Sequence, residues 1–417
     1  MKLPWYLLGG SAALAGYAYL GYPVLVKALS TLRPSPRPSP PPAEWPRISI
    51  TVPVYNEEAQ IRELLESLLA LDYPADRRQI LIVSDASSDR TDEIVREYAD
   101  RDVELLRLPA RGGKTAAENA ALQHLRGEIV VNTDASIRIH PQALRPLIAA
   151  FSDHEVGVAS GRDLSVTSHE EDPNAGESGY VGYEMWVRAC ETRLGGIVGA
   201  SGCFYAIRTE LHRRLLPGAL ARDFAAPLIA REQGYRAVSV DQALCFVPRT
   251  PSLRREYRRK VRTMAGGMET LLYFDHLLNP FRYGAFSWML FSHKVARWLV
   301  PAALAASAAG IGLQSVTDRQ ARWGIAAMAA AGALAGLGLA WPEGRKVPRP
   351  LAIAAYGAAG NVAVLHAWAR ALGQANNATW EPTRRAASPA QHGEKAAEKN
   401  GREAGSGSPN PAGGRRG

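Results

Sequence analysis

Four apolar segments, one near the N-terminus and three in the C-terminal third, most strongly limit the folds open to this chain. Each is long enough, as a helix rising about 1.5 Å per residue, to cross the hydrocarbon core of a membrane. The segments are residues 3–26, 298–316, 321–341 and 351–372. Alanine and glycine are frequent in the last two and allow close helix packing. The sequence therefore predicts an N-terminal transmembrane helix within 1–30 and C-terminal transmembrane helices within 298–373.

The N-terminal segment has two interpretations. Ala13-Leu14-Ala15 resembles the processing site of a cleaved signal peptide. The apolar run continues beyond that site for about three helical turns, which favours a retained spanning helix. Residues 31–46 follow and are rich in proline, which fixes φ and opposes helix formation. This stretch is expected to be an extended, semi-rigid linker.

The pattern changes at residue 47, where short apolar runs begin to alternate with amphipathic helical runs. This alternation is typical of βαβ units around a mostly parallel sheet. The expected strands include residues 48–54, 79–83, 103–106 and 129–131. The predicted fold class is therefore α/β, with a Rossmann-like domain over residues 47–270 that is flanked by transmembrane helices.

Carboxylates follow two of these strands. Asp85 and Asp134 stand at the strand ends, where open α/β sheets bind their ligands. Asp134 could bind a divalent cation whose remaining ligands come from phosphates and water, or it could simply cap the following turn. Asp85 could accept hydrogen bonds from a base or a ribose.

Gly112 and Gly113 precede Lys114 where the next helix should begin. Exposed backbone N–H groups and a lysine there favour anion binding, although the spacing is not that of a P-loop. The formal net charge of +9 is spread along the chain rather than gathered into one stripe. We therefore expect attraction to phosphates and to a membrane surface, and no nucleic-acid partner. The three cysteines have no CxxC spacing, so neither a disulfide framework nor a zinc site is indicated.

Four motifs occur in an order that resembles the nucleotide-sugar half of the family 2 glycosyltransferases, which have the GT-A fold. They are ITVPVYNEE, SDASSDRT, GGKTAAENAAL and NTDAS. The similarity continues through GASGCFYAIR, ARDFAAPL and EYRRKVRTMAGG to the terminal TWEPTRR, and so covers most of residues 48–385. The resemblance implies an inverting transfer from a nucleotide-diphosphate sugar, usually a UDP-sugar, with Mg²⁺ or Mn²⁺ on the diphosphate.

The resemblance also implies roles for individual residues. Asp223 matches the general base that takes the proton of the acceptor hydroxyl, although it could instead cap the helix that follows. Asp134 would bind the metal, and Ser136 stands where many members have a second aspartate. The residues implied in nucleotide-sugar binding are Pro53, Tyr55, Glu57, Asp85, Lys114, Asp134, Arg259 and Arg262.

The chain departs from the family pattern at several positions. The hydroxyl of Ser136 is a poorer metal ligand than a carboxylate. Arg222 precedes Asp223 where members commonly have an acid. Arg259 and Arg262 fall on a Gln-x-x-Arg-Trp motif whose glutamine and tryptophan are both absent. Arg262 keeps the arginine that can clamp a leaving diphosphate, whereas the missing tryptophan argues against a processive polymerase.

The segment from 161 to 191 begins as a polar loop and continues as a helical pattern. Glu184, Arg188 and Glu191 share one helix face and are expected to form a solvated stripe of ion pairs. Contact with the acceptor is expected from Trp186 alone. The basic run from 254 to 262 has a second interpretation, a helix lying on anionic head groups.

Residues 271–297 are expected to be an interfacial amphipathic segment, because His293, Lys294 and Arg297 interrupt its apolar run. The basic loop at 342–350 indicates the cytoplasmic side by the positive-inside rule, which agrees with a cytoplasmic catalytic domain. Residues 374–417 are basic, poor in aromatic residues, and expected to be largely disordered.

Two functions remain open. The first is an integral membrane enzyme that transfers sugar from a cytoplasmic nucleotide sugar to a lipid-linked or saccharide acceptor, in the synthesis of polysaccharide or glycolipid. The second is a catalytically degenerate scaffold that binds nucleotide or glycan in a polysaccharide assembly, which Arg222, Ser136 and the missing tryptophan favour. The retention of Asp85, Asp134, Asp223 and Arg262 together favours the enzyme more strongly. A partner subunit or an oligomer could supply further membrane helices.

Overall fold

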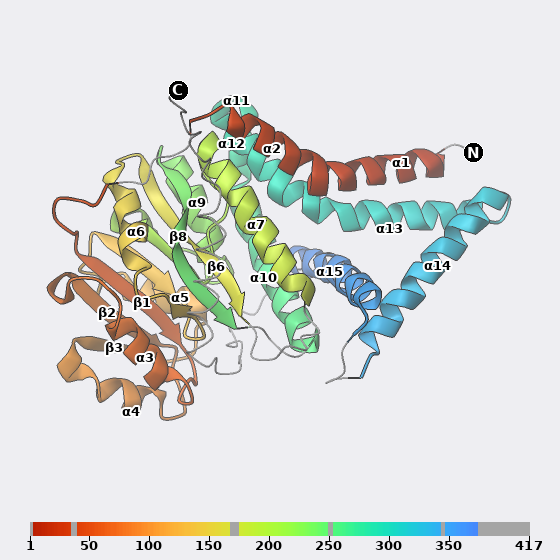
Figure 1. Cartoon of the computed structure of the whole chain (residues 1–417). Helices are drawn as coiled ribbons and strands as arrows, with labels where there is room; N and C mark the ends of the chain where they lie inside the picture. Colours follow the sequence, from red (N-terminus) through yellow and green to blue (C-terminus); the bar gives the residue numbers. More distant parts are fainter. Residues whose placement is uncertain (1–2, 35–39, 167–174, 249–252, 343–346, 374–417) are drawn as a thin grey trace, which may run out of the picture.

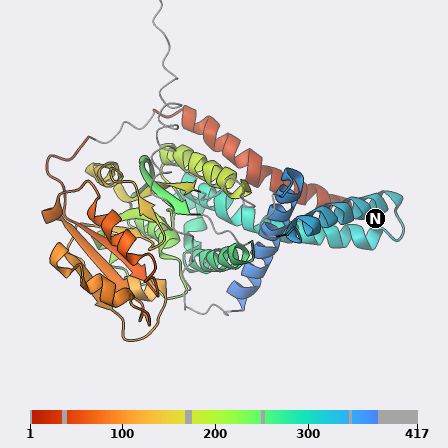
Figure 2. The ribbon, with the colours of Figure 1, turned by 60° about the horizontal axis from the view of Figure 1, so that its bottom comes forward.

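The computed structural model describes residues 3–34, 40–166, 175–248, 253–342 and 347–373. A sheet covered by helices forms one part, and long helices project from one side of it (Figure 1). A view turned by 60° shows the same projection away from the sheet (Figure 2). The expected tail at 374–417 lies outside the described residues.

Eight strands form one mixed sheet in the order β3-β2-β1-β4-β7-β6-β8-β5. Their bounds are β1 Ile48–Val54, β2 Arg78–Ser84, β3 Val103–Arg107, β4 Ile129–Thr133, β5 Arg138–Ile139, β6 Val156–Val166, β7 Phe204–Arg208 and β8 Arg236–Pro248. Strands β1 to β4 pair in parallel, and β7 joins β4 antiparallel. The α/β fold class and the four expected strands are confirmed.

Every residue of β1 is buried, as expected for a central strand with helices on both faces of its sheet. Helix α3 packs on this sheet because its apolar residues recur at helical spacing; Ile61, Leu64, Leu65 and Leu68 are all buried in the same core. The helices of this part are α3 Ile61–Leu69, α4 Thr91–Arg96, α5 Lys114–Ala121, α6 Leu144–Ala149, α7 Ala175–Leu194, α8 Thr209–His212 and α9 Arg222–Glu232. Short 3₁₀ turns are η2 Ala75–Arg77, η3 Ala99–Arg101 and η4 Ala150–Ser152.

Four helical segments among the described residues are long and apolar enough to cross a membrane: Trp5–Thr31, Ala285–Gln314, Arg319–Leu339 and Pro350–Leu372. The elements that contain or lead to them are α1 Leu3–Gly16, η1 Tyr17–Gly21, α2 Tyr22–Thr31, α10 Leu253–Tyr273, η5 Asp275–Leu278, α11 Pro280–Tyr283, α12 Ala285–Leu290, η6 Phe291–Val295, α13 Ala296–Gln314, α14 Arg319–Leu339 and α15 Arg349–Leu372. The sequence predicted one transmembrane helix before the α/β domain and further ones after it along the chain, and these segments agree with that prediction.

The segment expected to lie at the interface, residues 271–297, is divided differently in the structure. Helix α10 continues into it as far as Tyr273, and the helical stretch from Ala285 runs without a break to Gln314. Its charged side chains turn inward: His293 and Arg297 are buried and face α7. Ion pairing, rather than contact with water or head groups, therefore explains the charges in this apolar run.

Candidate active site

A cavity of about 840 Å³ lies where the carboxyl end of the sheet meets the long helices. Its volume falls in the range of small-molecule binding pockets. Seven of the residues predicted from sequence line it: Glu57, Lys114, Asp134, Ser136, Asp223, Arg259 and Arg262. Side chains from α13 and α15 close the opposite side. The cavity therefore joins the strand-end carboxylate of Asp134 to the candidate membrane helices.

Asp134 follows β4 and pairs with Lys114, the first residue of α5. Lys114 Nζ donates to Asp134 Oδ1 at 2.7 Å and approaches the carbonyl of Gly202 at 3.3 Å. Burial alone would lower the pKa of Lys114, but the carboxylates of Asp134, Glu118 and Asp223 raise it above its ordinary value. Lys114 is therefore a fixed cation at this end of the cavity.

Asp134 and Ser136 both line the cavity and could hold a divalent cation. The described residues contain no group of three or more His, Cys, Asp and Glu side chains with metal-binding geometry. A cation on a nucleotide diphosphate needs only one or two protein carboxylates, because phosphate oxygens and water complete its shell. The donor set fits such a cation, provided that Lys114 releases the oxygen to which it now donates.

Asp85 does not line the cavity. Its oxygens accept hydrogen bonds from the backbone N–H groups of Gly112, at 2.7 Å, and Gly113, at 2.9 Å. Gly113 has a φ of 89°, which favours glycine. In the structure Asp85 holds this turn before α5, so contact with a base would have to be made alongside these bonds. The sequence could not show this, because the strand and the glycine turn are far apart along the chain.

Pro53 lies within β1, and Tyr55 and Glu57 follow the strand; of these three residues, Glu57 lines the cavity. The guanidinium of Arg111 lies 3.9 Å from the centre of the Tyr55 ring, beside the glycine turn. Glu57 is buried, and its backbone N–H donates to Thr91 Oγ1 at 2.8 Å.

Asp223 is the second residue of α9, and the residue at the N-cap is Ala221. The side chain of Asp223 lines the cavity beside Gly202, where an added Cβ would lie 2.7 Å from Asp223 Oδ2. The helix-cap interpretation of Asp223 is therefore not supported. The carboxylate instead stands close to the Lys114 and Asp134 pair, since Lys114 also approaches the carbonyl of Gly202.

Arg222 is buried, lines the cavity next to Asp223, and pairs away from it. Its Nη1 donates to the carbonyl of His212 at 3.1 Å, and its Nε lies 3.6 Å from Glu118 Oε2. Burial raises the pKa of Glu118 to about 6, although Lys114 and Arg222 oppose this shift. The basic residue beside Asp223 thus has its own acidic partner on α5, which sequence reasoning did not identify.

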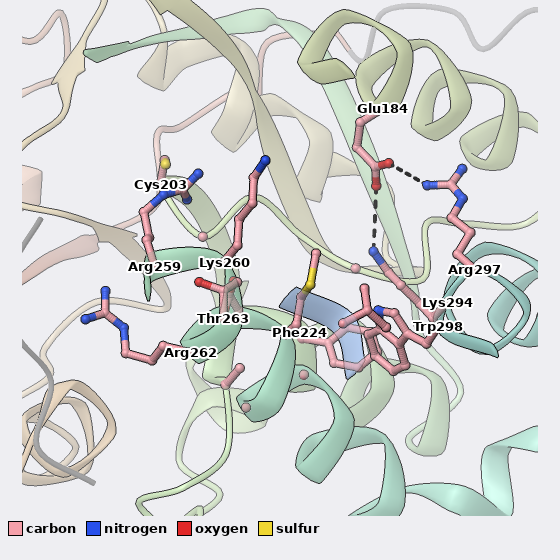
Figure 3. A pocket seen from close by; sticks show the side chains of 18 of the residues that line it. Glu184, Cys203, Phe224, Arg259, Lys260, Arg262, Thr263, Lys294, Arg297 and Trp298 are labelled. Atoms are coloured by element: carbon pink, nitrogen blue, oxygen red, sulfur yellow. Dashed lines mark hydrogen bonds and ion pairs between the residues drawn. The ribbon is translucent and has the colours of Figure 1, made fainter. Parts of the chain in front are cut away.

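Helix α10 contributes Arg259 and Arg262 to the cavity, as Figure 3 shows. Arg259 makes two hydrogen bonds with Glu256, at 2.8 and 2.7 Å. Lys260, between them, places its Nζ 3.5 Å from the centre of the Tyr356 ring on α15. These contacts hold the basic face of α10 against protein groups, which differs from a helix lying freely on head groups.

The expected solvated stripe on α7 is the clearest error of the sequence analysis. Glu184, Arg188 and Glu191 are 8%, 8% and 0% exposed, and the first two line the cavity. His293 lies between the two glutamates, with Nε2 2.8 Å from Glu184 Oε1 and Nδ1 2.6 Å from Glu191 Oε1. Arg297 Nη1 donates to Glu184 Oε2 at 3.0 Å.

Burial alone would raise the pKa of Glu184, but His293, Lys294 and Arg297 lower it well below its ordinary value. The signal for this cluster was available in the sequence as two matching patterns. Acidic residues recur at helical spacing on one segment, and basic residues interrupt an apolar segment far along the chain.

Trp298, and not Trp186, is the tryptophan that lies at the cavity. Trp186, predicted to contact the acceptor, is 40% exposed and does not line the cavity. Trp298 on α13 lines it and packs edge-to-face on Phe224, with ring centroids 6.2 Å apart. An aromatic ring therefore lies next to the neighbour of Asp223, although it comes from a candidate membrane helix rather than from α10.

The sequence was compared with known families and proteins. Residues 49–215 match the family model described as glycosyl transferase family 2. A beta-monoglucosyldiacylglycerol synthase of Trichormus variabilis is 32% identical over 156 residues, 36% of this chain and 33% of that protein. An N-acetylglucosaminyltransferase of Mesorhizobium japonicum is 28% identical over 275 residues, 60% of this chain and 63% of that protein. The chain thus spans about a third of the length of the first of these relatives.

Solved structures add a similarity over most of the chain. A mannosyltransferase from Pyrobaculum calidifontis, in complex with GDP-Man and Mn²⁺, superposes with a TM-score of 0.66 at 25% identity. The match covers 89% of this chain and 100% of that one. The fold described above is therefore shared with a glycosyltransferase that binds a nucleotide sugar and a divalent cation.

Proposed function

We propose that this chain, whose residues 49–215 match the model of glycosyl transferase family 2, is a membrane-integrated, inverting glycosyltransferase that uses a nucleotide-diphosphate sugar, in the first instance a UDP-sugar. One observation carries the proposal: a single cavity is lined by Lys114, Asp134, Asp223 and Arg262 and also by candidate membrane helices. A nucleotide sugar can enter from the sheet edge and an acceptor from the helices.

The donor end of the cavity is the part lined by Lys114, Asp134 and Ser136. Asp134, with Ser136 beside it, would hold Mg²⁺ or Mn²⁺ on the diphosphate, and the chemistry supplied there would be neutralisation of charge on the leaving group. Lys114 and the arginines of α10 supply further positive charge, which stabilises the diphosphate as the bond to the anomeric carbon breaks. A GDP-sugar is the other donor class to test, because the similar mannosyltransferase was solved with GDP-Man.

Asp223 is the general base of the proposed reaction. Its carboxylate takes the proton of the acceptor hydroxyl while that oxygen attacks the anomeric carbon from the face opposite the diphosphate. One C–O bond forms, one breaks, and the configuration at the anomeric carbon inverts. Gly202 permits this arrangement, because any side chain there would contact the carboxylate.

The acceptor is a lipid-linked or saccharide molecule, and the wall formed by α13 and α15 favours the former. Val300, Pro301 and Leu304 of α13 and Val364 of α15 line this wall. One relative is named as a synthase of a glucosyldiacylglycerol, and another as an undecaprenyl-phosphate transferase from Edwardsiella ictaluri that is 35% identical over 107 residues. Both names describe lipid products or acceptors.

The proposed location is the cell membrane, with the catalytic domain on the cytoplasmic side, where nucleotide sugars are available. The N-terminal helix supports a retained anchor, since it packs along α13. Ser307 Oγ lies 3.0 Å from Ser11 Oγ in a buried contact, and Tyr17 Oη lies 2.6 Å from Ser292 Oγ. Cleavage after the residues that resemble a processing site would remove the first of these contacts.

The test compares membranes containing the native chain with membranes containing Asp223→Asn, which preserves shape but cannot act as a base. A panel of UDP- and GDP-sugars is supplied with Mn²⁺ or Mg²⁺, and both sugar transfer and nucleotide affinity are measured. We expect one donor to be consumed and kcat to fall by about 10²- to 10⁴-fold in the variant, with nucleotide affinity retained. Nucleotide binding without transfer by the native chain, for every donor and with membrane lipid extract as acceptor, would support the scaffold instead.

A further inference from the structure

The wall of the cavity beside α7 and α13 carries more positive than negative charge. Arg188, Lys294 and Arg297 lie against Glu184 and Glu191, with His293 between the two glutamates. We call these six residues the α7/α13 cluster. Three permanent cations therefore face two carboxylates in a largely buried place, before any charge on His293 is counted. Buried charge without full compensation is costly, so the cluster is suited to an added anion.

Arg188 has donors that point to such an anion. Its Nη2 donates to the carbonyl of Ala200 at 3.2 Å, whereas Nε and Nη1 are buried and have no hydrogen-bond acceptor among the described residues. The nearest carboxylate oxygen to Nε, Oε1 of Glu184, is 3.8 Å away. Arg188 is 8% exposed and lines the cavity, so its donors can be satisfied from the cavity side.

Lys294 extends the same wall toward the proposed base. Its Nζ lies 3.6 Å from Glu184 Oε1 and 5.7 Å from the centre of the Phe224 ring, the residue after Asp223. Glu184 already has closer partners in His293 and Arg297, at 2.8 and 3.0 Å. The ammonium of Lys294 is thus the cation of the cluster that can most readily turn to a ligand.

The donor diphosphate is not the best match for these cations. In Figure 3, Arg259 and Arg262 lie on one side of the view, and Lys294 and Arg297 lie on the other. Lys294 Nζ lies 5.7 Å from the centre of the Phe224 ring, whereas Asp134 is paired with Lys114. Val300, Pro301 and Leu304 follow Lys294 in the same helical stretch and also line the cavity. An anion bound here would therefore be attached to an apolar chain.

We propose that Arg188 and Lys294 bind a phosphate on the head group of the acceptor lipid, so that the acceptor class is a phosphate-bearing lipid rather than a neutral diacylglycerol. The guanidinium offers two donors to phosphate oxygens and the ammonium adds a point charge. The apolar tails lie along α13 and α15. This inference rests on the proposed function, because it names the acceptor of the same cavity.

The test uses the full chain in a neutral detergent and two lipids with identical tails, dioleoyl phosphatidic acid and dioleoylglycerol. Affinity is measured with derivatives of both lipids that are brominated at the oleoyl double bonds and quench tryptophan fluorescence when they bind. We expect phosphatidic acid to bind at least about tenfold more tightly. The preference should shrink to about twofold or less in Lys294→Gln and return in Lys294→Arg. It should persist in the matched control Lys27→Gln, because Lys27 is exposed on α2 and outside the cavity.

Four outcomes would overturn the inference. Equal affinity for the two lipids would show that there is no phosphate subsite. A preference for phosphatidic acid that persists in Lys294→Gln would show that surface charge causes the preference. Inorganic phosphate that competes as well as the lipid shows that the tails play no part. Weaker UDP or GDP binding in Lys294→Gln assigns the cluster to the donor.

A different result would overturn the proposed function and leave this inference standing. A chain that prefers phosphatidic acid but transfers no sugar retains the lipid site and loses the enzymatic role.

Discussion

Gly202→Ala tests whether the position of the Asp223 carboxylate controls transfer. An added Cβ at residue 202 would lie 2.7 Å from Asp223 Oδ2, whereas ordinary contact begins at 3.4 Å. The carboxylate must therefore retreat by about 0.7 Å or rotate away. Gly202 does not have a positive φ angle, so alanine is compatible with the backbone and the effect is steric.

The expected loss follows from the cost of misplacing a reacting group. A displacement of about 1 Å can reduce the rate by about 100-fold, so we expect kcat to fall by about 10- to 100-fold in Gly202→Ala. Donor KM should change little, because Asp223 is not assigned to donor binding. The matched control is Gly182→Ala on α7, where an added Cβ meets no atom within 4 Å.

The assay is steady-state transfer with the donor that the panel identifies, together with nucleotide affinity as evidence that the site is intact. Transfer by Gly202→Ala within about twofold of the native rate would refute the reasoning, since the carboxylate would then tolerate displacement. Equal losses in both alanine variants would indicate a general effect of substitution. Combining Gly202→Ala with Asp223→Asn should add almost nothing to the loss from Asp223→Asn alone, because both changes act on one group.

Three further predictions concern the metal, an acidic group and the sheet. Chelation of divalent cations should abolish transfer and added Mn²⁺ should restore it, whereas Asp134→Asn should require at least about tenfold more Mn²⁺. The pKa of the Glu184 carboxyl is lowered in the folded chain. The contribution of this ionised carboxylate to the free energy of unfolding is therefore complete above pH 4.5, the ordinary pKa, and is lost as the pH falls through the lower pKa of the folded chain. Glu184→Gln should therefore lower the melting temperature at pH 7, and the gap to the native chain should narrow below pH 4.5. Gly127→Ala should cost about 3 kcal/mol in thermal unfolding, while Gly182→Ala costs little, because a Cβ at 127 would lie 2.4 Å from the backbone nitrogen of Ser49.

Much of the fold could be predicted from sequence because its signals are local. The strand β1 appears as a short, mainly apolar run that contains Ser49 and Thr51, and α3 appears as apolar residues at helical spacing. The candidate membrane helices are recognisable by length and hydropathy alone. Asp134 could be placed at a strand end because it follows directly on β4. Each of these inferences depends on neighbours along the chain, which one sequence contains.

The tertiary structure alone decided which polar groups have partners. The oxygens of Asp85 are engaged by a glycine turn 27 and 28 residues away, and Arg222 Nε lies near Glu118, which comes from another helix. Glu184 and His293 are separated by 109 residues. A helical stripe of alternating charge is the same in sequence whether it faces water or a second charged helix.

The sequence by itself therefore determined the architecture: an α/β domain between apolar helices, with carboxylates at its strand ends. The three-dimensional packing determined that one of these carboxylates, Asp134, shares a cavity with Asp223, α13 and α15, and that the cavity has a cationic wall. The physical reason is that burial depends on what is packed against a residue. Free energies of desolvation and pairing are set by contacts across space, which the order of residues does not record.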